Sequence, residues 1–233
     1  MAKIYRVIPA LLVLFLVLPS ASTMAAAEET KRVESATEVL SVIMEIPESA
    51  IPPVLLADAQ AVAIIPGVIK VGLFVGGQYG RGVLLVRGKG GAWSNPVFIT
   101  LKSGSIGWQI GAESTDFVIV FKTPRSIEGI MKGQYTLGAE AAAAAGPVGR
   151  SVKASTDIEL KAEIYSYSRS RGLFAGVSLE GSSLQIDDKS NAAYYEKEAV
   201  QPSGILSGQD VKTPPGAEML KNSLGKYAPA AAK

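Results

Sequence analysis

The fold of this 233-residue chain is indicated most clearly by one glycine-rich stretch, Gly72-Leu73-Phe74-Val75-Gly76-Gly77-Gln78-Tyr79-Gly80-Arg81-Gly82-Val83-Leu84. Its apolar residues come in short runs, and five glycines interrupt them. Glycine inside a strand marks a bulge, sharp curvature or the close approach of another backbone. The stretch therefore predicts strands that belong to a curled sheet.

Similar apolar runs, broken by glycine and proline, continue on both sides and predict further strands. The expected strands cover residues 61–65, 72–77, 82–87, 97–102, 106–112, 117–122, 157–166, 173–179 and 183–186, the last two flanking a turn at Glu180-Gly181. Helices are expected over residues 29–46, 124–131, 192–199 and 217–227. We therefore expect an α+β fold, mainly β, with a curled, glycine-rich antiparallel sheet or barrel-like core and a few flanking helices.

The first expected helix, residues 29–46, is amphipathic. It places Val33, Thr37, Leu40 and Ile43 near helical spacing, with charged residues elsewhere around the turn. Such a stripe either packs on the domain or lies on a membrane surface. The mixed charges of this helix favour packing on the domain.

The N-terminus has the order of a secretory signal peptide. Lys3 and Arg6 precede a 12-residue apolar run, and small residues follow up to Ala25-Ala26-Ala27. This run is too short for a transmembrane helix, which needs about 20 residues. We expect a cleavable signal peptide over residues 1–27, one domain over residues 28–228 and a flexible tail over residues 229–233. The protein is then periplasmic or secreted, or held peripherally at a membrane.

Composition excludes several classes of function. The chain has no cysteine and no histidine, which excludes disulfide scaffolds, thiolate nucleophiles, Cys or His metal sites and catalytic triads that use histidine. Its formal net charge is +2, and removal of residues 1–27 brings it to about zero, so no broad positive field attracts nucleic acid. Phosphate-loop and dinucleotide motifs are also absent from the sequence. We expect no enzyme activity, no nucleotide, no cofactor and no metal.

Two arginine-containing turns stand out. Arg169 and Arg171 directly precede an apolar run, and Arg150 follows the small-residue turn Ala145-Gly146-Pro147-Val148-Gly149. The planar guanidinium group suits phosphate, and exposed backbone amides in a turn can help to hold an anion. Each of these arginines can equally be a solvated turn residue.

Five segments together resemble the SYLF-domain family over residues 51–195. They are the stretch Gly72 to Leu84, Trp93-Ser94-Asn95-Pro96, Gln109-Ile110-Gly111, Ala145 to Arg150, and Ala162 to Gly181. The resemblance implies a non-enzymatic, lipid-binding module. Some eukaryotic members bind phosphoinositide-rich membranes and actin, whereas bacterial members with signal peptides look like envelope proteins that bind phospholipid. Because this chain carries a predicted signal peptide, phospholipids or a membrane surface are the expected partners and actin is not.

The resulting hypothesis is a phospholipid-binding protein of the bacterial cell envelope. An apolar groove supplies most of the affinity, and basic residues bind the lipid phosphate. The candidate lipid-binding residues are Arg150, Arg169, Arg171, Lys70, Arg81, Leu73, Phe74, Leu173 and Phe174. The alternative is an envelope scaffold that binds a protein partner. A third class, an enzyme that relies on Asp116, Asp157 or Lys226, fits the sequence least.

Overall fold

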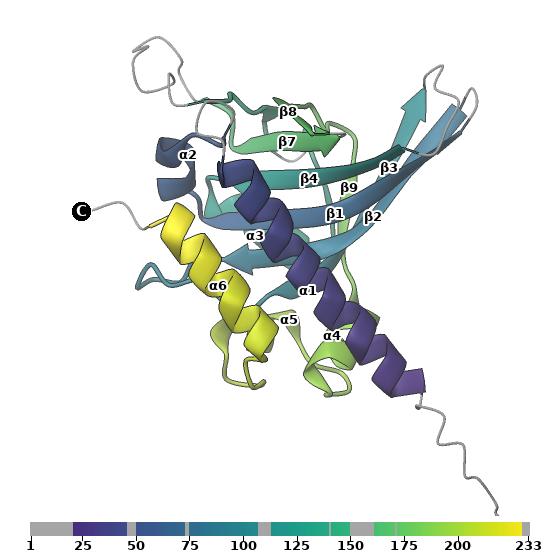
Figure 1. Ribbon diagram of the computed structural model, residues 1–233, viewed down its shortest axis with the longest axis vertical. Coiled ribbons are helices and arrows are strands. Elements are labelled where there is room, and N and C mark those ends of the chain that lie inside the picture. Colours follow the sequence, from purple (N-terminus) through teal and green to yellow (C-terminus); the bar gives the residue numbers. More distant parts are fainter. Residues whose placement is uncertain are drawn as a thin grey trace, which may run out of the picture.

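A curled sheet is the centre of the computed structural model, which describes residues 21–45, 50–72, 75–106, 113–139, 141–149, 161–170 and 172–229 (Figure 1). Its strands are β1 (Ala61–Gly72), β2 (Val75–Val86), β3 (Val97–Ile106), β4 (Glu113–Phe121), β5 (Gln134–Thr136), β6 (Ala143–Ala145), β7 (Ile164–Ser170), β8 (Leu173–Gly176) and β9 (Ser183–Ile186). They pair in the order β5-β9-β3-β2-β1-β4-β7-β6, and β8 also pairs with β7. The pair β6 and β7 is parallel, and the other pairs are antiparallel. The expected mainly β, α+β fold is confirmed.

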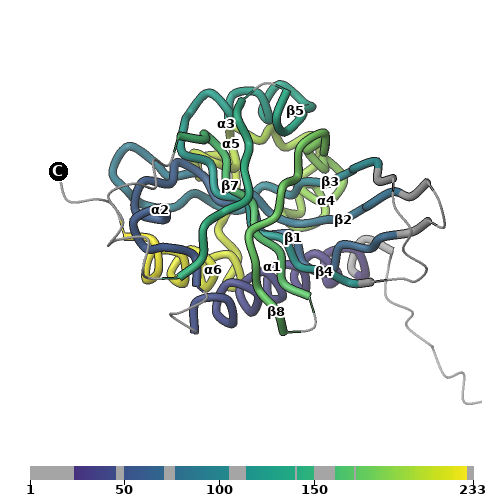
Figure 2. Tube along the Cα trace, turned by 90° about the horizontal axis from the view of Figure 1, so that it is seen from above, coloured from purple at the N-terminus to yellow at the C-terminus, as the bar shows by residue number. Residues whose placement is uncertain are grey.

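Helices cover both faces of the sheet. They are α1 (Ala21–Glu45), α2 (Pro53–Ala57), α3 (Pro124–Met131), α4 (Asp188–Tyr195), α5 (Pro202–Ser207) and α6 (Pro215–Tyr227). Figure 2 shows α1 and α6 on one side of the sheet and α3 and β5 on the other. Helix α1 contacts α4, α6, β1 and β2, so it crosses the centre of its face. Among the described residues, no helix has the length and apolar character needed to cross a bilayer.

The central strands are buried on both faces. Val62 and Ile64 of β1 belong to an apolar cluster that includes Leu40 of α1 and Leu220 of α6. The alternate residues of β1 belong to a second cluster on the opposite face, which includes the α3 residue Ile130. Burial of both faces explains why residues 61–65 form a continuous apolar run rather than an alternating one. The stripe of α1 packs on the domain, as expected, with Val33, Leu40 and Ile43 buried.

Strand β1 bends at a β-bulge next to Pro66. Between the pairs Ile65 to Phe117 and Val68 to Thr115, β1 contains one more residue than β4. Gly67 has a φ of 60°, which is a left-handed backbone conformation, and its N–H donates to Oδ1 of Asp116 at 2.9 Å. Proline lacks a backbone N–H and is accommodated in sheets at such bulges. The bulge therefore contributes to the curl that the glycine-rich stretch predicts.

Several expected elements differ from the structure. The expected strand 72–77 spans the end of β1 and the start of β2, and the expected helix 192–199 is displaced to α4. Of the expected strand 157–166, residues 164–166 are in β7 and residues 161–163 are not in a strand. Residues 157–160 lie outside the described residues, and so do residues 107–112 of the expected strand 106–112. The segments 173–179 and 183–186 do not form a hairpin, since β8 pairs with β7 whereas β9 pairs with β3 and β5. The sequence did not predict α2, α5, β5 or β6.

Candidate functional site

The candidate binding residues fall into three groups. Leu73, Phe74, Arg150 and Arg171 lie outside the described residues. The structure brings Arg169 and Phe174 together as partners across β7 and β8, and the exposed Leu173 lies next to them on β8, opposite Ser170. Lys70 and Arg81 lie on β1 and β2. The described candidates therefore do not form a single site.

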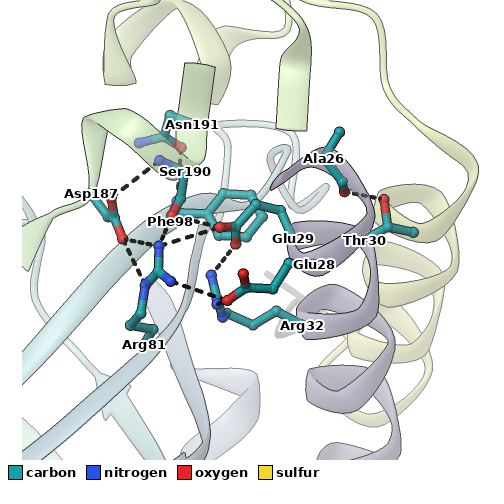
Figure 3. A network of polar contacts seen from close by, with 10 residues as sticks. All are labelled: Ala26, Glu28, Glu29, Thr30, Arg32, Arg81, Phe98, Asp187, Ser190 and Asn191. Atoms are coloured by element: carbon teal, nitrogen blue, oxygen red, sulfur yellow. Dashed lines mark hydrogen bonds and ion pairs between the residues drawn. The ribbon is translucent and has the colours of Figure 1, made fainter. Parts of the chain in front are cut away.

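Arg81 is the centre of a polar cluster that joins β2, α1 and α4 (Figure 3). Its Nε and Nη2 atoms both donate to Oδ2 of Asp187, each at 3.1 Å. Nη2 also donates to Oγ of Ser190 at 2.7 Å and to Oε1 of Glu29 at 3.3 Å. Nη1 donates to Oε1 of Glu28 at 3.2 Å. We call these residues, together with Arg32, the Arg81 cluster.

The Glu29 side chain is the most deeply buried carboxylate of this cluster. The residue is only 3% exposed. Its Oε1 accepts a hydrogen bond from Oγ of Ser190 at 2.9 Å, and its Oε2 pairs with Nη1 of Arg32. Burial raises the pKa of Glu29 above its usual value, although Arg32, Ser190 and Arg81 pull it down. Paired in this way, the carboxylate is held inside the fold.

Asp187 has the opposite shift. Burial alone would raise its pKa, but hydrogen bonds from Ser190 and the charge of Arg81 outweigh burial and lower it. The same carboxylate is the N-cap of α4, where Oδ1 accepts from the Ser190 N–H at 3.1 Å. Asp187 therefore fixes the start of α4 and the Arg81 guanidinium together.

The cluster holds the fold together at a junction of three elements. Each nitrogen of the Arg81 guanidinium donates to a carboxylate of this chain. A ligand that approached Arg81 would compete with these contacts. Sequence patterns gave no sign of its partners, although Glu28, Glu29 and Arg32 lie at the spacing of neighbours on one helix.

Arg169 is also engaged within the chain. Its Nε and Nη2 atoms donate to Oδ2 of Asp116 at 3.0 and 2.8 Å. The other oxygen of Asp116 accepts from the Gly67 N–H of the bulge. Next to this pair, Phe174 stacks on the buried ring of Tyr167, with 5.3 Å between the ring centroids. Arg169 and Phe174 therefore support the packing of β1, β4, β7 and β8.

An apolar pair is exposed at the far end of the sheet. In Figures 1 and 2, the far ends of β1, β2 and β3 project away from the rest of the fold. Ile69 of β1 is paired with Tyr79 of β2, which is paired with Lys102 of β3. Ile69 is 49% exposed and Tyr79 is 48% exposed. We call the row formed by these residues and Ser114 of β4 the arm surface.

Comparison with known proteins gives the family. A family model described as "Ysc84: Las17-binding protein actin regulator" matches residues 102–227. The chain belongs to the Ysc84 family. The resemblance to SYLF domains is thereby confirmed, and the matched region continues past Tyr195, where the expected resemblance ended.

Several eukaryotic relatives support the membership of the Ysc84 family. The SH3 domain-containing YSC84-like protein 1 of Xenopus laevis is 37% identical over 182 residues, which is 78% of this chain and 54% of that relative. Protein YSC84 of Saccharomyces cerevisiae is 37% identical over 184 residues, which is 78% of this chain and 39% of that relative. LAS seventeen-binding protein 3 of the same yeast is 36% identical over an equal share. The chain therefore spans about half of the length of these relatives or less.

The comparisons correct the expected partners. The expectation of phospholipids or a membrane surface, without actin, is wrong, because the family description and the yeast names refer to Las17 binding and actin regulation. Both are associations with proteins. The family description names binding and regulation rather than a reaction, which agrees in general terms with a non-enzymatic role.

Proposed function

We propose that this Ysc84-family chain is a scaffold module that binds a protein partner, with filamentous actin as the first partner to test. The observation that carries the proposal is the match to a family described as a Las17-binding protein and actin regulator, together with an identity of 36 to 37% over 78% of the chain with two yeast relatives. The relatives are longer, so the partner is a proposal for this chain. The chain's own surface supplies further support.

The arm surface has the character of a protein-binding surface. Its centre, Ile69 and Tyr79, is apolar and about half exposed. Lys102 and Ser114 flank this centre, and both are exposed. Binding energy at protein interfaces concentrates in a few apolar and aromatic side chains, among which tyrosine is enriched. The arm surface therefore offers a compact apolar centre with a polar border.

The engagement of the arginines also supports protein binding over recognition of a phosphate. Arg81 is paired with Asp187, Glu28 and Glu29, and Arg169 with Asp116. Freeing either guanidinium would remove an ion-pair partner from carboxylates that are partly or fully buried, which is destabilising. A ligand that needed these arginines would have to repay this loss. An apolar partner on the arm surface meets no such obstacle.

The proposal is tested by co-sedimentation of the full chain with actin filaments. We expect saturable binding by the wild type and at least about tenfold weaker binding by the double variant Ile69→Ser, Tyr79→Ser, because truncation of central interface residues has effects of this size. Both side chains are half exposed, so the variant should fold. Circular dichroism checks that it does.

Leu173→Ser is the matched control for this experiment. Leu173 is 79% exposed on β8, so the change removes an even more accessible apolar side chain that is not part of the arm surface. Binding by this variant should equal that of the wild type. An equal loss in both variants would reject the arm surface as the contact. Absence of the wild type from the filament pellet at every concentration would reject actin as the partner.

A further inference from the structure

A second surface lies at the opposite end of the same strands. Ala61 pairs with Val86 on one side and Phe121 on the other, at the end of the sheet remote from the pair Ile69 and Tyr79. Beyond these residues an open cleft of about 1050 Å³ is present. Its charged and polar lining consists of Asp58, Gln60, Arg87, Lys89, Lys122 and Glu128. Val86 and Ile127 contribute apolar surface to the same cleft.

Arg87 is the unusual member of this lining. Its Nε donates to the carbonyl oxygen of Ala59 at 2.8 Å, and its Nη2 donates to those of Leu56 and Ala228, each at 2.9 Å. Its guanidinium carbon lies 4.4 Å from the ring centroid of Trp93. Nη1 is buried and has no hydrogen-bond partner. The side chain is therefore held in place by carbonyl groups and an aromatic ring.

The charge of Arg87 is not neutralised by the described part of the chain. Arg32, Arg81 and Arg169 each pair with a carboxylate, whereas no carboxylate among the described residues pairs with Arg87. Burial also lowers the pKa of Arg87. A partly buried charge of this kind favours an incoming group of opposite sign.

Lys89 adds a second positive charge on the same wall. It stands in the turn Gly88-Lys89-Gly90-Gly91, which the Gly91 N–H closes by donating to the Gly88 carbonyl oxygen at 2.9 Å. Lys89 is exposed, and it forms no ion pair with any residue that the structure describes. Nothing lies within 4 Å of a β-carbon placed on Gly90, so the turn leaves room beside the lysine.

Asp58 and Glu128, both exposed, also line the cleft. A ligand with several negative charges would therefore place them against Arg87 and Lys89 and away from these two acids. The volume of the cleft lies at the upper end of the range for small-molecule sites, about 300 to 1000 Å³. A short peptide segment fits this combination of size, apolar surface and charge.

We propose that this cleft binds an acidic peptide segment of a protein partner, with its carboxylates against the wall formed by Arg87 and Lys89. The proposal goes beyond the binding of a partner at the arm surface and does not depend on it. A chain with both sites could hold two protein segments at the two ends of its central strands. The exposed Lys89 is the residue to change, since Arg87 also supports the fold.

The experiment is isothermal titration calorimetry of the full chain with an acetylated, amidated hexaglutamate peptide at low ionic strength. We expect saturable binding that weakens with added salt, and at least about tenfold weaker binding by Lys89→Glu, because reversal of a contacting charge turns attraction into repulsion. Lys212→Glu is the matched control, since Lys212 is exposed and does not line the cleft. This control should retain at least half of the wild-type affinity.

Three results would overturn the proposal. The wild type could fail to bind hexaglutamate at low salt, hexalysine could bind as tightly as hexaglutamate, or Lys89→Glu and Lys212→Glu could weaken binding equally. Because Lys89→Glu leaves the arm surface intact, its co-sedimentation with actin separates a failure of this cleft from a failure of the proposed function.

Discussion

Asp187 and Glu29 are close neighbours in the Arg81 cluster, yet their pKa values move in opposite directions. Burial favours the neutral form of Glu29 and raises its pKa. At Asp187, burial is outweighed by the groups that stabilise the charged form, so the pKa is lowered. A raised folded pKa at Glu29 contributes stability at low pH that is lost as pH rises through that pKa. A lowered folded pKa at Asp187 contributes stability above its ordinary value near 3.8 that is lost as pH falls through the folded pKa.

Asp187→Asn should therefore lower the free energy of unfolding at pH 7 by about 1.5 to 3 kcal/mol, the range for hydrogen bonds to charged groups. The difference from the wild type should shrink as the pH falls from 3.8 through the lower pKa of the folded state, because the unfolded chain then binds a proton at Asp187 that the folded chain does not. Urea unfolding at pH 7 and pH 3 measures both differences. Asp188→Asn, an exposed neighbour, is the control and should change little at either pH. A constant difference at both values would contradict the assigned pKa direction.

At the residue scale, the sequence identified Arg81 and Arg169 as notable and could not identify their partners. Arg169 is separated from Asp116 by 53 positions, and Arg81 from Asp187 by 106. Pairings at such separations depend on strand register and on helix packing, neither of which follows from local spacing. The sequence therefore selected both arginines as candidate phosphate-binding residues but could not show that the fold itself uses them.

The close approach of β1 to β2 is the feature that matters most at the scale of elements. A β-carbon on Gly82 would clash with the Ile64 carbonyl oxygen and would lie 2.7 Å from Cα of Ile65. On Gly80 it would clash with the Val68 side chain and lie 2.8 Å from Cγ2 of Ile65. These glycines allow β2 to lie against the bend of β1 beside the bulge.

Gly82→Ala should therefore destabilise the protein by about 1 to 3 kcal/mol or more, the usual effect of overpacking, because backbone atoms would have to move. Gly104→Ala on β3 is the control, since nothing lies within 4 Å of a β-carbon placed there. Thermal unfolding compares the two variants. Equal melting temperatures would show that β1 can shift away from β2 without loss.

The elements that the sequence predicted best have apolar runs bounded by clear signals. The expected strand 183–186 is identical to β9, and Thr123-Pro124 begins α3, although the Thr123 hydroxyl donates to Glu163 rather than capping the helix. The alternating pattern of residues 157–166 predicted a surface strand in the wrong place. Strand β7 begins at Ile164 and is buried at four successive positions, because other strands flank it and both of its faces are covered. Alternation detects strands with one solvated face and misses this one.

At the scale of the whole molecule, the two proposed surfaces lie at opposite ends of β1 and β2, and the Arg81 cluster secures α1 between them. The predicted signal peptide ends at Ala27, within α1 and directly before Glu28 and Glu29. Cleavage after Ala27 would thus leave every described residue of the Arg81 cluster in the chain. The position of this boundary can be tested by its effect on stability.

A chain that begins at Glu28 should match the melting temperature of one that begins at Met24, because Met24 is 63% exposed. A chain that begins at Thr30 lacks Glu28 and Glu29 and leaves Arg81, Arg32 and Ser190 short of partners. It should unfold with a free energy about 1 to 3 kcal/mol lower, the usual penalty for buried polar groups left unsatisfied. Differential scanning calorimetry compares the three chains. Equal stability of all three would show that the cluster does not secure α1.

The partners in the Arg81 cluster are far apart in the sequence, which affects when the cluster can form during translation. Glu29 is 52 residues from Arg81 and 161 residues from Ser190. During translation, the first helix and the hairpin of β1 and β2 emerge long before α4 does. Contacts at such separations form late and slowly. The N-terminal half therefore lacks the contacts of the cluster with Asp187 and Ser190 until α4 has been made.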